Sequence, residues 1–305
     1  MTGPGSGTPE HAERFTVLRP LLFTIAYEIL GTATESDDVL QESYLRWAKV
    51  DLDEVHDTKA YLAQLVTRQA LNALRAAARR REDYVGPWLP EPLLLDGALA
   101  GKDASSDVVL AESVSMAMMV VLETLTPDER AVFVLREVFG FEHDEIASAV
   151  GKSATAVRQI AHRARGHVHA RRKRFEPIDP QRSQELTNQF FLAAATGDMD
   201  QLLAMLAPDV VWTADSAGKV SAARRPVTGA VKVAKLVVGL TRLGGPSARV
   251  ETAMYNSAPA LVLYLDDHLE GVITAEVMDG KITHLYAMRN PDKLAGVTVP
   301  RQISR

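Results

Sequence analysis

The sequence predicts a multidomain protein in which two all-α domains are followed by an α+β domain. Apolar residues recur at helical spacing through residues 13–84 and again through residues 108–174, and strand-like runs gather in residues 175–305. A proline-rich linker, residues 85–107, separates the two helical segments. With 305 residues, the chain is long enough to bury more than one hydrophobic core.

Composition excludes several classes of protein. The chain has no cysteine, which rules out disulfides, cysteine-ligated zinc and thiol chemistry and fits a reducing cytoplasm. No apolar run reaches membrane-spanning length, and the start of the chain lacks the apolar core of a secretion signal. We therefore expect a cytoplasmic protein with no membrane contact, no metal and no cofactor. The net charge of −5 would argue against nucleic acid if charge were uniform, but basic residues concentrate in two helical segments.

The first helical domain follows a tail, residues 1–12, that is expected to be disordered. A helix from Phe15 ends at Gly31, with Pro20 either kinking it or marking a helical start. The next helix, ESDDVLQESYLRWAKV, buries one face and turns polar side chains outward at Asp38, Gln41, Glu42 and Arg46. Alone, such an acidic amphipathic helix is usually a plain surface helix.

A third helix, Thr58 to Arg81, is strongly basic. It has no acidic residue between Lys59 and Arg81. One basic helix is often a solvated face, but a second basic helix in the same chain indicates two contacts along a DNA duplex.

The second helical domain contains a helix-turn-helix pattern, Phe141 to Arg174. Ala147 stands four residues before Gly151, where a small side chain lets two helices cross closely and glycine permits a left-handed turn. Val157 follows six residues after the glycine and would fill that crossing.

Charge indicates what the second helix of this pattern contacts. From Lys152 to Arg174 there are eight Lys or Arg residues and no Asp or Glu. The alternative is a solvated basic face on an ordinary helical hairpin. Side chains suited to base edges and phosphates lie off the apolar stripe: Arg158, Gln159, His162, Arg163 and Arg165.

Two stretches carry a family resemblance. AYEILGTATESDDVLQESYLRW resembles region 2 of extracytoplasmic-function (ECF) sigma factors, group IV of the primary-sigma family. LTPDERAVFVLREVFGFEHDEIASAVGKSATAVRQIAHRARGHV resembles their region 4, with Glu142 departing from the usual serine cap. The matches cover residues 13–84 and 108–174, in the right order and at the right distance.

The resemblance implies a promoter-specificity subunit of bacterial RNA polymerase. It assigns docking on the polymerase core, at the β and β′ subunits, to Asp38, Gln41, Glu42 and Arg46. It assigns recognition and opening of the −10 element to Trp47, Arg68, Asn72, Arg75, Arg79 and Arg80. It assigns reading of the −35 element to Thr155, Arg158, Gln159, His162 and Arg163.

The linker contains the string GPWLPEP, whose three prolines forbid a helix and favour an extended segment. Trp88 and Leu89 are too apolar for water, so we expect them to dock on a neighbouring domain. W-L-P-E-P resembles a signature of the SigJ-like ECF group, whose members carry a C-terminal SnoaL-like domain. The following LLLDGALAGKDASSD is expected to be a flexible connector.

The third domain is expected to be an α+β cone of the SnoaL/NTF2-like type, with two helices followed by a curved antiparallel sheet. The helices are Gln184–Thr196 and Met199–Leu206. The strands are Val210–Thr213, Ala248–Tyr255, Ala260–Tyr264, Gly271–Met278 and Lys281–Met288, the last two joined by an Asp279-Gly280 hairpin. The A-D-S-A-G-K stretch resembles the D-G-G-G-K motif of the group, and N-P-D-K-L matches its second motif in full.

Cones of this kind enclose a pocket, and some relatives are enzymes that use buried carboxylates as bases. Candidates here are Asp215, His268, Glu276, His284 and Tyr286. Because neither an apolar pocket nor an oriented partner can be read from sequence, we expect no enzymatic activity. An unknown small-molecule ligand in the cone stays open.

Three functions stay open. The first is a sigma factor with an attached regulatory domain, the second a small-molecule enzyme fused to a DNA-binding module, and the third a DNA-binding regulator that acts without polymerase. The acidic helix favours the first, because an independent regulator has no use for it. We then expect polymerase core and promoter DNA as partners and a monomeric free chain.

The SnoaL-like domain is expected to act in cis on the two sigma domains. The residues expected to carry this regulation lie in the linker and the two motifs: Trp88, Leu89, Pro90, Glu91, Pro92, Asp215, Gly218, Lys219, Asn290, Pro291, Asp292, Lys293 and Leu294.

Overall fold

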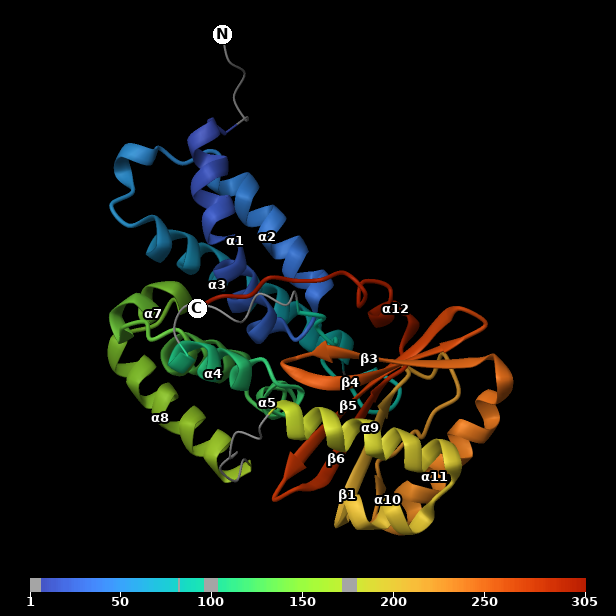
Figure 1. The fold of residues 1–305 in the computed structure, drawn as a ribbon. Helices are drawn as coiled ribbons and strands as arrows, with labels where there is room; N and C mark the ends of the chain where they lie inside the picture. Colours follow the sequence, from blue (N-terminus) through green and yellow to red (C-terminus); the bar gives the residue numbers. More distant parts are fainter. Residues whose placement is uncertain (1–6, 82, 96–103, 172–179) are drawn as a thin grey trace.

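The computed structural model describes residues 7–81, 83–95, 104–171 and 180–305. Figure 1 shows two helical domains packed side by side and an α/β domain next to them. None of the helices in these ranges is long and apolar enough to cross a membrane. The predicted combination of two all-α domains and one α+β domain is confirmed.

The first helical domain consists of α1 (Pro9–Leu30), α2 (Ala33–Trp47) and α3 (Thr58–Arg81), which pack on one another. Because α1 already begins at Pro9, the expectation of a disordered tail through residue 12 is wrong for residues 9–12. Proline at the first helical position suits a helix start. Pro20 lies inside α1, and the helix ends at Gly31 in the left-handed conformation, as predicted.

The second helical domain contains α4 (Ala104–Ser113), α5 (Met116–Leu122), α6 (Pro127–Phe133), α7 (His143–Val150) and α8 (Ala154–Arg171). A turn of π-helix, Val134–Val138, follows α6. The predicted helix-turn-helix is confirmed in α7 and α8, because Gly151 has a φ of +70° and both Ala147 and Val157 are buried. The helical domain starts four residues earlier than the predicted boundary at residue 108.

The two helical domains share one hydrophobic core. α3 lies against α6 and α7, and α1 also contacts α6. A continuous set of buried side chains includes Leu22 of α1, Val66 of α3, Val132 of α6 and Val157 of α8. The two domains therefore form a single packed body, which we call the closed form.

The third domain is built on a sheet of six strands in the order β2-β1-β6-β5-β4-β3. The strands are β1 (Leu206–Asp215), β2 (Val227–Thr228), β3 (Ala248–Tyr255), β4 (Ala258–Leu265), β5 (His268–Met278) and β6 (Lys281–Met288). β1 pairs with β6 in parallel, so the expectation of a purely antiparallel sheet is wrong at this pair. The Asp279-Gly280 hairpin is confirmed, with φ values of +51° and +71°.

Helices cover one face of the sheet. They are α9 (Pro180–Thr196), α10 (Met199–Met205) and α11 (Ala230–Gly244), and α11 was not predicted. Alternate residues of β6 face opposite sides: Leu285 packs with these helices, and Tyr286 belongs to the other face. On that other face the sheet meets Leu89 of the linker and Met116 of α5.

The linker is extended across the junction of the domains. Leu93 and Leu95 are buried, Leu94 pairs with Tyr255 at the edge of β3, and Leu95 pairs with Arg301. The expectation of a flexible connector is therefore wrong for residues 93–95, because backbone pairing and burial fix their positions. Residues 96–103 of that connector lie outside the described residues.

Candidate nucleic-acid interface and interdomain junction

The outer face of α8 is basic and open to solvent. Its apolar stripe packs inside the second helical domain, which turns the polar side chains outward. The five side chains predicted to read the −35 element are all exposed: Thr155, Arg158, Gln159, His162 and Arg163. The last four line a shallow hollow of about 420 Å³. This row of donors is suited to base edges and phosphates.

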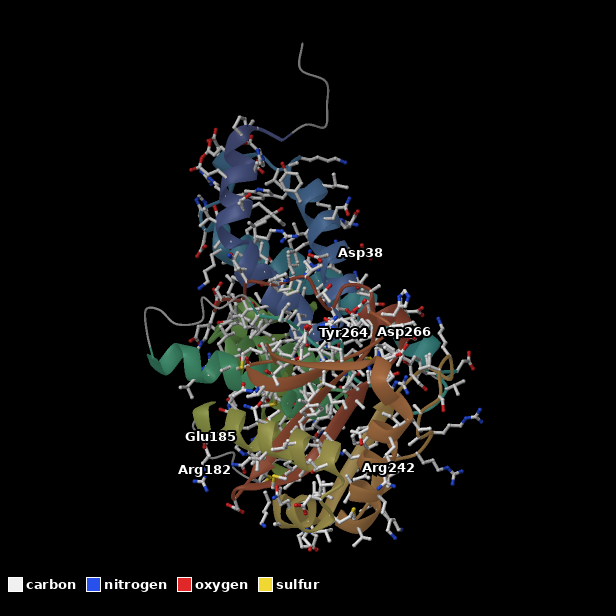
Figure 2. All side chains as sticks on the ribbon, turned by 45° about the vertical axis from the view of Figure 1, so that its right-hand side comes forward. Asp38, Arg182, Glu185, Arg242, Tyr264 and Asp266 are labelled. Atoms are coloured by element: carbon white, nitrogen blue, oxygen red, sulfur yellow. The ribbon has the colours of Figure 1, made fainter. Side chains whose placement is uncertain are left out.

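The polar face of α2 is also open. All four side chains predicted to dock on polymerase are exposed: Asp38, Gln41, Glu42 and Arg46. Arg46 Nε lies 2.9 Å from Glu42 Oε1, one helical turn away. Figure 2 labels Asp38 on the first helical domain, apart from the α/β domain that carries Glu185 and Arg242.

The basic face of α3, in contrast, is engaged by the second helical domain. Arg75 Nη2 lies 2.6 Å from Asp128 Oδ1, and Lys152 Nζ lies 2.9 Å from the other oxygen of that carboxylate. Arg68 Nη2 donates to the carbonyl of Ser148 in α7 at 3.1 Å. Burial alone would raise the pKa of Asp128, but its bonds to Lys152 and Arg75 outweigh burial and lower it.

Other predicted −10 residues differ in their positions. Asn72 is exposed on α3. Trp47 is fully buried, and its indole N–H donates to the carbonyl of His11 at 2.9 Å. The prediction that Trp47 contacts DNA is therefore wrong for this structure, because the ring is part of the core. The side chains of Arg79 and Arg80 lie outside the described residues.

At the linker, Asp215 binds several groups at once. Its carboxylate accepts from the Tyr84 hydroxyl at 2.5 Å and from the Leu89 backbone N–H at 2.9 Å. Lys293 Nζ lies 2.8 Å from the second oxygen, and both side chains of this pair are buried, with exposures of 0% and 5%. The two sequence motifs of the α/β domain thus meet on the linker, which confirms that Trp88 and Leu89 dock on a neighbouring domain.

The ammonium group of Lys293 is enclosed by the linker. It donates to the Leu89 carbonyl at 2.5 Å and lies 3.1 Å from the centre of the Trp88 ring. Burial lowers the pKa of Lys293, although the Asp215 carboxylate acts in the opposite direction. A buried ammonium is tolerated here because a carboxylate, a carbonyl and an aromatic face all contact it.

The remaining motif residues shape this site. Asn290 caps α12 (Pro291–Leu294) and donates to the Tyr84 hydroxyl at 2.9 Å. Gly218 has a φ of +71°, and a Cβ there would come within 2.9 Å of Val85, so the linker approaches closely. Lys219 and Asp292 form an ion pair at the surface.

Glu91 connects the linker to the first helical domain. Its carboxylate accepts from the backbone N–H groups of Ala33 and Thr34, at 2.7 Å and 3.1 Å. These are unpaired donors of the first turn of α2, so a residue of the linker caps this helix. Its neighbours Pro90 and Pro92 are buried, which anchors the extended segment on both sides.

Asn256, which sequence reasoning missed, joins all three domains. Its amide nitrogen donates to the Tyr27 hydroxyl and to the Val114 carbonyl, both at 2.8 Å. Its amide oxygen accepts from the Leu93 N–H at 2.9 Å. An Asn-Ser pair between two strands predicts only a turn, so the long-range hydrogen bonds of Asn256 could not be predicted from the sequence.

Three of the five candidate residues of the α/β domain meet at Glu276, and the other two lie elsewhere. Glu276 Oε2 accepts from the Tyr286 hydroxyl at 3.0 Å and lies 3.1 Å from His284 Nδ1. Burial, together with Glu276, raises the pKa of Tyr286. His268 is exposed beyond the Asp266-Asp267 turn, where Figure 2 labels Asp266, and Asp215 belongs to the linker site.

Comparison with known proteins matches both helical domains. Residues 15–80 match Sigma-70 region 2, and residues 115–168 match Sigma-70, region 4. The chain is 38% identical over 291 residues to the ECF RNA polymerase sigma factor SigJ of Mycobacterium tuberculosis, covering 92% of each. It is 29% identical over 279 residues to the probable ECF RNA polymerase sigma factor SigI of that species, covering 90% of this chain and 92% of the relative.

A solved structure is similar to nearly the whole chain. The crystal structure of M. tuberculosis SigJ matches with a TM-score of 0.75 at 33% identity, over 94% of this chain and 99% of that one. The region 2 match falls on α1–α3, and the region 4 match falls on α5–α8 with their exposed basic helix. The chain therefore belongs to the ECF RNA polymerase sigma factors, which direct polymerase to promoters, and it is similar to SigJ over its full architecture.

Proposed function

We propose that the C-terminal domain and the linker hold this sigma factor in the closed form, from which binding of polymerase and promoter DNA releases it. The proposal is supported by the contacts that two arginines of α3 make with region 4. Arg68 and Arg75 bond to Ser148 and Asp128 of region 4, while the polar face of α2 is exposed. In the closed form, Arg68 and Arg75 are therefore not free to contact the −10 element, whereas the surface of α2 is open to polymerase.

Polymerase core is proposed to dock on α2 through Asp38, Gln41, Glu42 and Arg46. All four project to solvent from a helix whose other side is buried, so charge reversal here leaves the core intact. The double variant Asp38→Lys with Glu42→Lys should weaken binding to core polymerase in a pull-down. Asp200→Lys with Glu185→Lys, on exposed sites of the C-terminal domain, is the matched control. Equal capture of both variants would remove this assignment.

The exposed face of α8 is proposed to read the −35 element. A bidentate arginine–guanine pair is worth about 1–3 kcal/mol of discrimination against the wrong base. Arg158→Ala should relax sequence preference if Arg158 reads a base, and should weaken all sites alike if it contacts phosphate. Binding to promoter and scrambled duplexes, measured at one salt concentration, separates the two results. Unchanged binding to both duplexes would contradict the assignment of Arg158 to the DNA interface.

Regulation in cis is proposed to act through the linker site. Lys293 and Asp215 hold the linker on the C-terminal domain, Glu91 holds it on region 2, and Asn256 contacts both helical domains. Covalent attachment gives such contacts an effective concentration in the millimolar range for short linkers, so weak contacts are populated. Releasing the linker should therefore free regions 2 and 4 to separate.

In vitro transcription with core polymerase tests this regulation. Trp88→Ala and Lys293→Met should increase transcription from a cognate promoter, because each loosens the closed form. Arg242→Met, at an exposed site of the C-terminal domain, should behave as the unmodified chain. Circular dichroism must show equal helix content in all four proteins. Equal transcription by all four would show that the C-terminal domain does not regulate the sigma regions.

A further inference from the structure

Glu28 is buried where region 2 meets region 4. It lies in α1, its side chain has 0% exposure, and it faces Ser113 at the end of α4 and Arg130 of α6. An ionised carboxylate in such a place is costly unless it is paired and fully hydrogen-bonded. Its protonation state therefore bears directly on how tightly the two regions pack.

The hydrogen bonds around Glu28 indicate a neutral carboxylic acid. Ser113 Oγ lies 2.6 Å from Glu28 Oε1 and 2.9 Å from the carbonyl oxygen of Leu110. A serine hydroxyl has one proton to donate, and a carbonyl oxygen can only accept. Both contacts are satisfied when Ser113 donates to Leu110 and a protonated Glu28 donates to Ser113. Within the described part of the chain, Glu28 Oε2 has no hydrogen-bond partner, which suits a neutral acid better than a carboxylate.

The nearby arginine is already engaged. Arg130 Nη1 lies 2.6 Å from Glu123 Oε1 of the α5 end, and Arg130 Nε donates to the backbone carbonyl of Glu28 at 2.7 Å. Burial raises the pKa of Glu28 to about 8, against the lowering effect of the Arg130 charge. The guanidinium therefore binds the backbone of residue 28 and the carboxylate of residue 123. Within the described residues, Arg130 Nη2 and Glu28 Oε2 both lack a hydrogen-bond partner, so Arg130 acts on the Glu28 side chain through its charge alone, and burial outweighs that effect.

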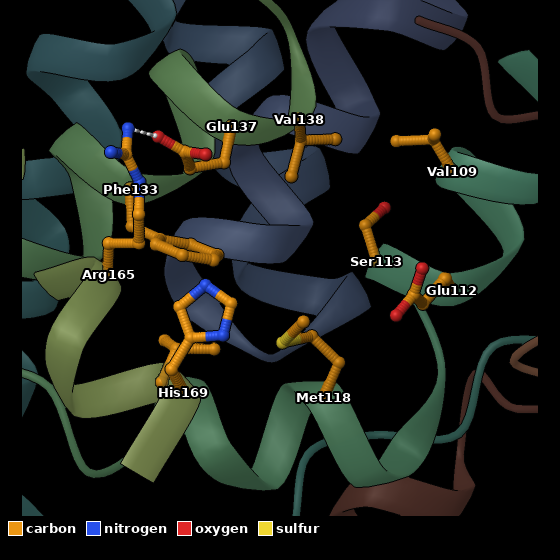
Figure 3. A pocket seen from close by; sticks show the side chains of 10 residues that line it. Val109, Glu112, Ser113, Met118, Phe133, Glu137, Val138, Arg165 and His169 are labelled. Atoms are coloured by element: carbon orange, nitrogen blue, oxygen red, sulfur yellow. Dashed lines mark hydrogen bonds and ion pairs between the residues drawn. The ribbon is translucent and has the colours of Figure 1, made fainter. Parts of the chain in front are cut away.

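Ser113 also borders a cavity of about 270 Å³ within region 4, shown in Figure 3. Charged and titratable side chains line it: Glu112, Glu137, Arg165 and His169. Arg165 Nη2 lies 2.6 Å from Glu137 Oε1, the pair joined by a dashed line in the figure. On its own helix, Glu28 has the buried Tyr27 hydroxyl as a titratable neighbour.

We propose that Glu28 and Ser113 form a proton-dependent latch between regions 2 and 4. In the closed form Glu28 is a neutral acid whose O–H donates to Ser113. When the regions separate, the side chain enters water and ionises, so opening releases one proton to solvent. The proposal rests on the opening described above, but the state of Glu28 in the closed form can be tested without it.

The direction of the pH effect follows from proton linkage. The pKa of Glu28 is higher in the closed form, about 8, than its ordinary value of 4.5 in water. Its contribution to closure is therefore complete below 4.5 and is lost as pH rises towards 8. Within that window the opening constant should rise about tenfold per pH unit, or about fifty-fold from pH 6 to pH 8, and then level off.

Carboxyl-carbon NMR of the full chain with ¹³C-labelled glutamate tests the closed form directly. One resonance should titrate near pH 8 and disappear in Glu28→Gln. Burial also raises the pKa of Glu91, so Glu91→Gln is recorded in parallel to assign its signal. A Glu28 resonance that titrates near 4.5 would overturn the latch while leaving the proposed regulation in place.

Energy transfer between two dyes tests the consequence for opening. Since the chain has no cysteine, Val17→Cys in α1 and Gly166→Cys in α8 give one label in each region. Val17 is 74% exposed, and a Cβ at Gly166 meets no atom within 4 Å. The separated population should grow between pH 6 and pH 8, and Glu28→Gln should keep it at the low-pH level. Glu185→Gln, an exposed acid-to-amide control, should follow the unmodified chain; an identical response in Glu28→Gln would overturn the latch.

Discussion

The side-chain amide of Asn256 lies 2.8 Å from the hydroxyl of Tyr27, 229 positions earlier in the chain. The same nitrogen reaches the Val114 carbonyl, so a turn of the C-terminal domain touches both sigma regions through one group. Tyr27 in turn donates to the Glu91 carbonyl at 2.7 Å, which continues the network into the linker. The closed form is thus specified by directional bonds as well as by apolar packing.

Removing the Asn256 amide should destabilise the closed form. Asn256→Ala removes the partner of the Val114 carbonyl and of the Leu93 N–H, and one of the two hydrogen bonds of the Tyr27 hydroxyl, at about 1–3 kcal/mol for each group left unsatisfied. Asn256 also has a φ of +50°, so Asn256→Gly separates the loss of bonds from backbone strain. Urea unfolding of both variants measures the effect. Asn188→Ala, on the exposed side of α9, is the control, and equal midpoints for Asn256→Ala and Asn188→Ala would contradict the prediction.

The two ion pairs of the linker site should differ sharply in strength. Asp215→Ala leaves the ammonium of Lys293 buried and unpaired, which typically costs about 3–5 kcal/mol. Lys219→Ala breaks only the surface pair with Asp292, where about 0–1 kcal/mol is expected. Both variants are compared by chemical unfolding followed through tryptophan emission, because release of the linker exposes Trp88. Similar losses in the two variants would show that burial does not govern this site.

Asp128 should restrain DNA binding by region 2. Asp128→Asn weakens its bonds to Arg75 and Lys152, and exposed pairs of this kind are worth about 0.2–1 kcal/mol. Affinity for single-stranded −10 DNA, measured by fluorescence anisotropy, should therefore rise by a factor of about 1.4–5. Glu142→Gln, which breaks the Arg136 pair inside region 4, is the control and should leave affinity unchanged.

The same aspartate has a pH signature opposite to that of Glu28. The pKa of Asp128 is lowered below its ordinary value of 3.8, so its contribution to closure is present above that value and is lost as pH falls through the lowered pKa. Between pH 6 and pH 8 Asp128 should therefore contribute no pH dependence to DNA binding. A slope in that range that Asp128→Asn abolishes would contradict this.

Capping of α2 by Glu91 should stabilise the helix that carries the proposed polymerase surface. Glu91→Ala removes the acceptor of the Ala33 and Thr34 N–H groups, and loss of a cap costs about 0.5–2 kcal/mol. Amide hydrogen exchange should accelerate in the first turn of α2, and Glu54→Ala at an exposed site should not change it. Unchanged exchange in Glu91→Ala would mean that α2 does not depend on the linker.

Local sequence patterns predicted helices, strands and turns better than the contacts between them. Gly31, Gly151 and Gly280 each mark a chain reversal that the structure has, because a glycine signal depends on nearby residues alone. No element was predicted between Thr213 and Ala248, so α11 was missed although its buried Val233 and Val237 lie at helical spacing. The parallel β1–β6 pair was missed because a register between distant strands has no local signal.

The candidate site shows the same limit. Arg68, Arg75 and Lys293 were predicted as site residues, but their contacts with Ser148, Asp128 and Trp88 could not be predicted from residue spacing. Trp47 was assigned to the −10 element by the resemblance to region 2, whereas packing against His11 and Tyr61 holds it in the core. Whether an aromatic side chain is buried or exposed depends on the tertiary fold.

The bond between Lys293 and the Leu89 carbonyl joins positions 204 apart, and this separation matters while the protein is being made. Regions 2 and 4 leave the ribosome first, and translation at about 5–20 residues per second takes on the order of ten seconds to travel from Arg171 to Lys293. During that interval the nascent chain carries both sigma regions without the lysine that encloses Trp88. The proposed restraint is therefore absent from each newly synthesised molecule until its C-terminal domain folds onto the linker.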